Sequence, residues 1–405
     1  METKAPSGPL TGLRVFDLTR VLAGPTATQM LGDLGADVIK IEKPGAGDDT
    51  RGFAPPFMPG TKESAYFTGV NRNKRSLTLD IATPDGQALA LRLIARCDIL
   101  VENFKVGALA KYGLAYEQLK GRFPGLIYGS ITGFGQTGPY APRPGYDSLI
   151  QAMGGVMSLT GEPDGPPQKV GVPVADLFAG LYGCIGILAA LRHREKTGAG
   201  QQIDIGMLDA HVAWLANQGM NYLATGENPA RLGNQHPNIV PYQVFPTEDG
   251  HIVLSIGNDP TFQRFCAAFG LAALLGDARF ATNAARVENR ALVTETLTPV
   301  MRRHPTAWWV ENLETLKIGC GPINRLSEVF ADPQILARGA IVEMDQPAAA
   351  DGKVKVIANP VRLSATPPDY RLAPPHLGEH SASVLAELLG LGEAELSGLR
   401  AKGVI

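Results

Sequence analysis

One acidic residue, Asp176, lies at the start of a long apolar segment, residues 177–191, which ends at basic residues. A carboxylate before such a segment can cap a helix by accepting a backbone N–H, which stabilises the helix by about 1 kcal/mol. It can also be a nucleophile, because a helix N-terminus keeps a carboxylate ionised and carboxylates form covalent acyl intermediates. Attack on a thioester would give a mixed anhydride and a free thiolate. The residues alone leave both roles open.

A cluster of basic residues, Arg72, Lys74 and Arg75, lies between a predicted loop and a short strand. Lys105 and Lys111 follow another predicted strand. Such a cluster is usually a solvated face, but Lys and Arg also bind phosphates well. A ligand with several phosphates is therefore the alternative to a solvated face.

Patterns typical of other chemistries are missing from the sequence. The first predicted strand is followed by RVLAGP and not by GxGxxG, so a dinucleotide cofactor is not expected. No GxSxG elbow occurs, and no histidine lies at a recognisable catalytic spacing. The cysteines are far apart and form no CxxC pair, which predicts no zinc site, no disulfide framework and a reducing compartment. They are Cys97, Cys184, Cys266 and Cys320.

The elements that must position these residues alternate between strand and helix. Strands are predicted at 13–18, 36–42, 98–103, 125–131 and 201–208, and helices from Pro25 to 34, at 85–96, at 107–121, after Asp176 and up to about 224. This alternation predicts an α/β fold with a Rossmann-like, doubly wound parallel sheet. Ligands bind such sheets beyond the carboxyl ends of the strands, which places Val21, Leu22, Ala23 and Lys43 near a ligand.

The chain changes character after residue 225. A turn-rich stretch precedes a predicted hairpin around Glu248, Asp249 and Gly250, and helices follow to about 317. We expect a large domain over 1–225, a small α+β domain over 226–330, and a segment over 331–405 that returns to the large domain. That last segment has a predicted hairpin, GAIVEM with KVKVI, and a last helix after LGEH.

Composition limits the possible partners. The net charge of −2 gives no global attraction for nucleic acid. The longest apolar run, about 15 residues, is short for a membrane span, so no membrane partner is expected. We predict a cytoplasmic protein.

A series of motifs in order along the chain resembles one known family. The motifs are DLTRVLAGP, GDLGADVIKIEKPGAGDDTR, NRNKRSLTLDI, VENF, SITGFGQTGP, PGYD, VADLFAG, GILAAL, QQIDIGMLDA and LGEH. Together they resemble the family III, formyl-CoA transferase-like (CaiB/BaiF-like) CoA-transferases, and most closely the succinyl-CoA:glutarate branch. The resemblance implies an interlocked homodimer and a catalytic Asp176 that forms an aspartyl anhydride and then an aspartyl-CoA thioester.

The same resemblance implies that coenzyme A binds as a thioester substrate, with no tightly bound cofactor and no metal. Its expected contacts are Val21, Leu22, Ala23, Lys43, Leu79, Ala82, Asn103, Phe104, Lys105, Lys111, Tyr146 and Asp147. A dicarboxylate acceptor would need a cation, for which Arg20, Arg51 and Arg143 are candidates. Leu22 stands where oxalate-using members carry a glutamine, which argues against oxalate or formate.

Two other functions remain open. Family members that racemise 2-methylacyl-CoA have a histidine at the position of Tyr146, so Tyr146 argues for transfer. A non-catalytic CoA-binding protein would keep the binding residues without the chemistry. The sequence does not fix which diacid accepts CoA.

Overall fold

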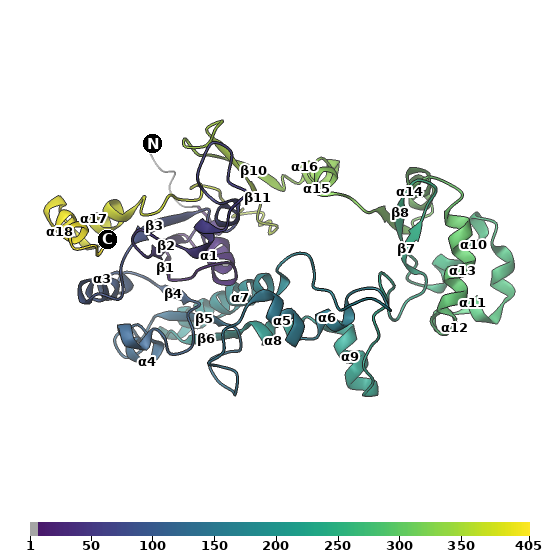
Figure 1. Ribbon diagram of the computed structural model, residues 1–405, viewed down its shortest axis with the longest axis horizontal. Helices are drawn as coiled ribbons and strands as arrows, with labels where there is room; N and C mark the ends of the chain where they lie inside the picture. The colour runs from purple at the N-terminus through teal and green to yellow at the C-terminus, as the bar shows by residue number, and fades with distance from the viewer. Residues whose placement is uncertain (1–6) are drawn as a thin grey trace. The chain divides into compact units, whose positions relative to one another are not determined.

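The computed structural model describes residues 7–405, which form two compact units (Figure 1). The first unit contains the chain up to residue 154 together with 171–214 and 333–405. The second contains 155–170 and 215–332. The sequence-based boundaries at 225 and 330 remain a prediction about domain organisation.

A six-stranded parallel sheet forms the centre of the first unit, with strand order β3-β2-β1-β4-β5-β6. The strands are β1 Arg14–Asp17, β2 Asp37–Glu42, β3 Lys74–Thr78, β4 Ile99–Glu102, β5 Ile127–Thr132 and β6 Gln202–Gly206. The chain order reverses between β1 and β4, so this is the doubly wound parallel sheet that the sequence predicts. The carboxyl ends of β1, β4 and β5 therefore meet at one edge.

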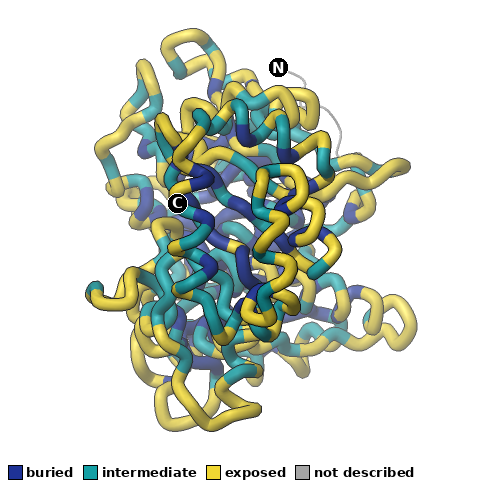
Figure 2. Tube along the Cα trace, turned by 90° about the vertical axis from the view of Figure 1, so that its right-hand side faces the viewer, coloured by how far each residue is buried: buried dark blue, intermediate teal, exposed yellow. Residues whose placement is uncertain are grey.

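Helices cover both faces of the sheet. Val15 packs on one face against α1 (Ala23–Asp33) and α7 (Val174–Thr197). Phe16, next in sequence, points to the other face, which is covered by α3 (Pro84–Ile94), α4 (Tyr116–Leu119), α17 (Ser381–Leu389) and α18 (Glu393–Ala401). Figure 2 shows the buried segments in dark blue and the exposed loops in yellow.

The remaining elements of the first unit are short. They are η1 Asp49–Gly52, α2 Ala65–Gly69, η2 Ala110–Tyr112, α5 Asp147–Met153, α8 Met207–Ala213, α16 Pro333–Ala337, β10 Ile341–Asp345 and β11 Lys353–Ile357. β10 and β11 pair as an antiparallel hairpin, as predicted.

The second unit is an antiparallel sheet, β7-β8-β9, with helices. Its strands are β7 Tyr242–Pro246, β8 His251–Ser255 and β9 Gly319–Pro322. Its helices are α6 Val156–Leu159, α9 Ala216–Thr225, α10 Asp259–Ala268, η3 Ala272–Gly276, α11 Ala278–Ala281, α12 Asn283–Glu288, α13 Arg290–Met301, α14 Thr306–Thr315 and α15 Leu326–Val329. The hairpin predicted around Asp249 is confirmed.

Three predicted helices are each divided in two. Gly113 adopts a left-handed conformation (φ 72°) and separates η2 from α4, where one helix over 107–121 was expected. Ala216 (φ 47°) lies at the break between α8 and α9. Gly390 (φ 69°) separates α17 from α18. A left-handed residue cannot continue a right-handed helix, so each break follows from one backbone conformation.

Helix α7 is longer than the apolar run suggested, at 24 residues. By length and composition it is the one helix in the described residues that could cross a membrane, although half of its most apolar stretch is buried inside the fold. It packs against β5, β6 and α1, as the core helix of an α/β layer does.

Candidate active site

Asp176 lies in the first turn of α7 but does not cap it. The N-cap position is occupied by Pro173, and no side chain of the cap accepts a hydrogen bond. The first-turn N–H of Ala175 instead donates to Oδ1 of Asp147 at 2.9 Å. The helix-cap interpretation of Asp176 is therefore wrong, and its carboxylate has no hydrogen-bond or ion-pair partner among residues 7–405.

The Asp176 side chain faces a cleft of about 230 Å³ at the carboxyl edge of the sheet. The cleft is formed by the loop after β1, the segment after β4, the end of β5 and the start of α5. It contains these residues named from the sequence: Arg20, Val21, Leu22, Ala23, Asn103, Phe104, Lys105, Arg143, Tyr146, Asp147 and Asp176. Residues separated by more than 150 positions thus surround one space.

A second groove, of about 400 Å³, contains the other predicted CoA contacts Lys43, Leu79 and Ala82. Arg20, Asp49 and Phe104 line both spaces, so the groove continues from the cleft. Such a path suits a long ligand whose reactive end reaches Asp176.

Two predicted site residues lie outside both spaces. Lys111 lies over the ring of Tyr112, which lines the groove, with its Nζ 4.7 Å from the ring centre. Arg51 donates to both carboxylate oxygens of Glu42 at 2.8 Å and pairs with Glu63 at 3.1 Å. These bonds hold the Arg51 guanidinium within the fold, so it is not the cation that binds a substrate carboxylate.

Burial and electrostatics raise the pKa of the Asp176 carboxyl to about 7. Burial is the larger cause, because it penalises the charged form, and the nearby Asp147 adds a smaller repulsion. The raised pKa is opposite in direction to the effect expected of a helix N-terminus, which favours the ionised carboxylate.

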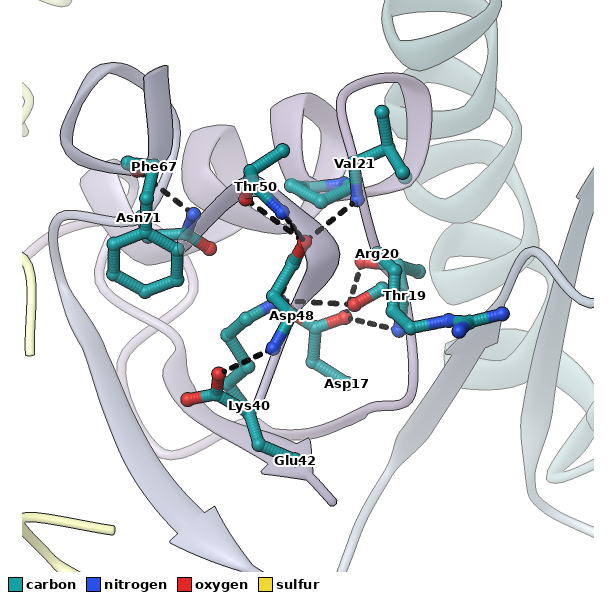
Figure 3. A network of polar contacts seen from close by, with 12 residues as sticks. Asp17, Thr19, Arg20, Val21, Lys40, Glu42, Asp48, Thr50, Phe67 and Asn71 are labelled. Atoms are coloured by element: carbon teal, nitrogen blue, oxygen red, sulfur yellow. Dashed lines mark hydrogen bonds and ion pairs between the residues drawn. The ribbon is translucent and has the colours of Figure 1, made fainter. Parts of the chain in front are cut away.

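A buried ionic network stabilises the loop between β1 and α1 (Figure 3). Lys40 Nζ donates to Asp48 Oδ2 at 2.8 Å and to the carbonyl of Thr19 at 2.9 Å. Asp48 Oδ1 accepts the N–H of Val21 at 3.1 Å. Val21 has φ 68°, a strained conformation for a β-branched residue, so the network fixes a backbone shape that the chain disfavours.

The basic cluster on β3 and the preceding loop belongs to this buried framework. Arg72 donates to both oxygens of Asp33 at 2.8 and 2.6 Å. Lys74 is fully buried and lies 3.2 Å from Asp17. Arg75 pairs with Asp37 and with the helix α17. Both predictions for the cluster, a solvated face and a phosphate site, are therefore wrong. Charged residues inside otherwise apolar strands, Asp17 on β1 and Lys40 on β2, were the one signal in the sequence that this region contains buried charges.

Asn103 joins two walls of the cleft. Its side chain accepts the N–H of Arg20 at 2.9 Å and donates to the carbonyl of Arg20 at 2.6 Å. The side chain thus tethers the loop after β1 to the segment after β4.

Two arginines differ in their surroundings. Arg20 lies 3.4 Å from Asp49 and 4.9 Å from the ring of Phe104. Arg143 is stacked on Tyr140 at 4.0 Å and has no carboxylate partner in the described part of the chain. A stacked, unpaired guanidinium is ready to receive a carboxylate.

Tyr66 in α2 was not predicted from the sequence. Burial raises the pKa of its hydroxyl, and the negative charges of Asp176, Asp147 and Asp48 raise it further. Its ring packs edge-on against Phe53 at 5.6 Å. No spacing in the sequence connects Tyr66 to Asp176. Within residues 7–405 no group of three potential metal ligands occurs.

Comparison with known proteins identifies relatives along nearly the whole chain. The model of CoA-transferase family III matches residues 10–381. A succinate–glutarate CoA-transferase of Agrobacterium fabrum is 50% identical over 385 residues, which cover 94% of this chain and 96% of that protein. A succinyl-CoA:glutarate CoA-transferase of Mus musculus is 44% identical over 397 residues, which cover 98% of this chain and 90% of the relative. A solved structure of a CAIB/BAIF family protein from Brucella suis has a TM-score of 0.83 at 48% identity, and covers 94% of this chain and 100% of that chain.

Proposed function

The chain belongs to CoA-transferase family III, and from this premise we propose that it moves CoA from succinyl-CoA to a dicarboxylate such as glutarate, with Asp176 as the covalent carrier. The names of two relatives at 50% and 44% identity support this donor and this acceptor. One observation carries the role of Asp176: its half-buried carboxylate, unpaired within residues 7–405, faces the cleft that contains most of the expected CoA contacts.

The proposed reaction proceeds in four steps. The ionised Asp176 attacks the thioester carbonyl of succinyl-CoA, which forms a mixed anhydride and expels the CoA thiolate. The thiolate attacks the aspartyl carbonyl, so succinate leaves and an aspartyl-CoA thioester remains. The acceptor carboxylate then attacks this thioester, which forms a second mixed anhydride, between Asp176 and the acceptor, and releases the thiolate again. Attack of the thiolate on the acceptor carbonyl gives the new acyl-CoA and restores Asp176.

The walls of the cleft supply the remaining roles. The backbone of residues 21–23 and 103–105 would hold the CoA chain, and the groove lined by Lys43 would take its distal end. Arg143 and Arg20 would bind the second carboxylate of the diacid, because both line the cleft that Asp176 faces. Lys111 remains a proposed contact at the rim of the groove.

Mass spectrometry tests the reaction directly. We expect protein mixed with succinyl-CoA to carry a CoA adduct on the peptide that contains Asp176, and glutaryl-CoA to form when glutarate is added. Asp176→Ala should abolish both products, whereas Asp164→Ala, at an exposed position, should retain them. Full activity in Asp176→Ala would contradict the mechanism, and deuterium exchange at the α-carbon of a 2-methylacyl-CoA without an acceptor would favour racemisation.

We further propose that the active molecule is an interlocked homodimer. Helix α7 supports this, because it exposes a run of apolar side chains, Leu181, Tyr182 and Ile185, on the side away from the sheet. A cytoplasmic location and the lack of a tightly bound cofactor stay predictions from the sequence.

A further inference from the structure

Asp147, at the start of α5, provides the cap that α7 lacks from its own sequence. The residue before α7 is Pro173, which has no side-chain acceptor, and the N–H of Val174 turns back to the carbonyl of Val172. The next N–H, that of Ala175, donates to Asp147 Oδ1 at 2.9 Å. The residue adjacent to the proposed nucleophile is thus fixed by a carboxylate from another helix, 28 positions away in sequence.

The other oxygen of Asp147 is also held. Gln151, one turn later in α5 and fully buried, donates its Nε2 to Asp147 Oδ2 at 2.7 Å. Both bonds come from uncharged donors, and no salt bridge to Asp147 occurs within residues 7–405. Asp147 therefore has a fixed orientation and an uncompensated charge, and it lines the same cleft as Asp176.

We propose that Asp147 is a positioning residue for Asp176 and not a CoA contact: it caps α7 across the interface with α5 and places a like charge beside the nucleophile. This inference rests on the proposed function. It differs from the role that resemblance suggested for Asp147, because each of its oxygens accepts a hydrogen bond that orients the chain beside Asp176.

Other charged and titratable groups also surround Asp176. Tyr66 of α2 interacts electrostatically with it, and the cleft also presents these groups: Arg20, Asp49, Lys105, Arg143 and Tyr146. Burial is the larger cause of the raised pKa of Asp176. Of the charged groups around it, only Asp147 raises this pKa further. A more basic carboxylate is a stronger nucleophile, so the charge of Asp147 favours the first attack on the thioester.

Asp147→Asn separates the two roles, because the amide keeps an oxygen for the Ala175 N–H and removes the charge. Its NH2 group can donate to the side-chain oxygen of Gln151 once that amide turns over. We would label the protein with γ-¹³C aspartate, identify the Asp176 resonance through Asp176→Asn, and titrate it without turnover. We expect its midpoint in Asp147→Asn to fall by about 0.5–1 pH unit, as expected when a like charge is removed from a shared site. The acid limb of kcat/KM for succinyl-CoA should shift in the same direction.

Asp147→Ala removes the cap as well and should lower kcat at least tenfold while free CoA binds with unchanged Kd. An unshifted Asp176 midpoint in Asp147→Asn would overturn the proposal. So would weakened CoA binding with an unshifted titration, since that result would assign Asp147 to the ligand. If the wild-type protein transfers no CoA but the midpoint shifts, the proposed function fails and the positioning role stands.

Discussion

At the scale of single residues, the most informative quantity is the proton affinity of Asp176. Its pKa of about 7 lies well above the usual 3.8 of an aspartate, because the folded protein buries the carboxyl beside another acid. An ionised carboxylate is the attacking species, so the rate of acyl transfer should rise with pH up to about 7. The same burial that makes the group reactive also makes it costly to the fold.

That cost leads to a stability prediction. A folded-state pKa raised above the unfolded value means that stability falls as pH rises from about 4 to 7, because the unfolded chain ionises this carboxyl freely and the folded chain does not. Asp176→Asn removes the penalty. We expect its Tm to exceed that of the wild type at pH 8, by about 2–4 °C for each kcal/mol recovered.

Differential scanning calorimetry at pH 5 and pH 8 checks this. The Tm gain should be larger at pH 8 and should shrink at pH 5, where the wild-type carboxyl is mostly protonated in the folded state. An equal gain at both pH values would indicate a packing effect and would contradict the raised pKa.

Arg143 allows a prediction about substrate choice. Its guanidinium is stacked on Tyr140, lacks a carboxylate partner among the described residues, and lines the cleft of Asp176. We expect Arg143→Gln to raise KM for glutarate about tenfold or more, because a charged hydrogen bond contributes roughly 1.5–3 kcal/mol. KM for butyrate, which lacks the second carboxylate, should stay unchanged. Steady-state kinetics with both acceptors measures the difference, and equal losses with both would remove Arg143 from the distal-carboxylate role.

At the scale of elements, α1 and α7 pack so closely that glycine is required between them. A Cβ added at Gly180 would lie 2.6 Å from the carbonyl oxygen of Ala23 and 2.9 Å from Cβ of Thr26. Both partners belong to α1, whose first turn lines the cleft through Ala23. Gly180 therefore lets the nucleophile helix approach the helix that follows the CoA-binding loop.

We expect Gly180→Ala to destabilise the protein by about 1–3 kcal/mol, as overpacking does, although alanine is the better helix former. Activity should fall as well, because α1 must shift. Gly398→Ala is the matched control, since it lies in α18 with nothing within 4 Å of an added Cβ and should be neutral or slightly stabilising. Urea unfolding and transfer assays compare the two variants, and equal stability would show that the interface can adapt.

The elements also show what the sequence could predict. Apolar strands such as β1 and turn residues such as Gly35 depend on local pattern, so the parallel sheet and both hairpins were predictable. The ion pairs of Arg72 and Lys74 were not, because each partner is 30 to 60 positions away. The parallel order of β1, β2 and β3 brings Lys74 close to Asp17, and the packing of α1 against the loop before β3 brings Asp33 close to Arg72. A short stretch of sequence does not distinguish a buried, paired charge from an exposed one, because the pairing partner belongs to another element.

The residues of the site also fall into those that the sequence predicts and those that depend on the packing of the fold. Asp176 was identified by its place before an apolar run, and the loop of Val21 to Ala23 and Lys43 by the predicted strand ends. The remaining contacts came from family resemblance. The cap by Asp147 and the tether by Asn103 depend on side-chain directions in packed elements, which no spacing contains. Arg51 was misassigned for the same reason, since Glu42 and Glu63 occupy it.

At the scale of the whole molecule, the exposed face of α7 gives the last prediction. Leu181, Tyr182 and Ile185 are 37, 39 and 59% exposed on the central helix of an α/β layer, where burial is the rule. A second copy of the chain that covers this face would account for them. Ile185→Lys would then place a charge in the dimer interface, and we expect it to lower the dimer fraction at micromolar concentration in light scattering coupled to size exclusion. Leu223→Lys is the control, because Leu223 is an apolar residue 74% exposed on α9, which belongs to the second unit. A dimer unchanged by Ile185→Lys would show that this face of α7 does not form the interface.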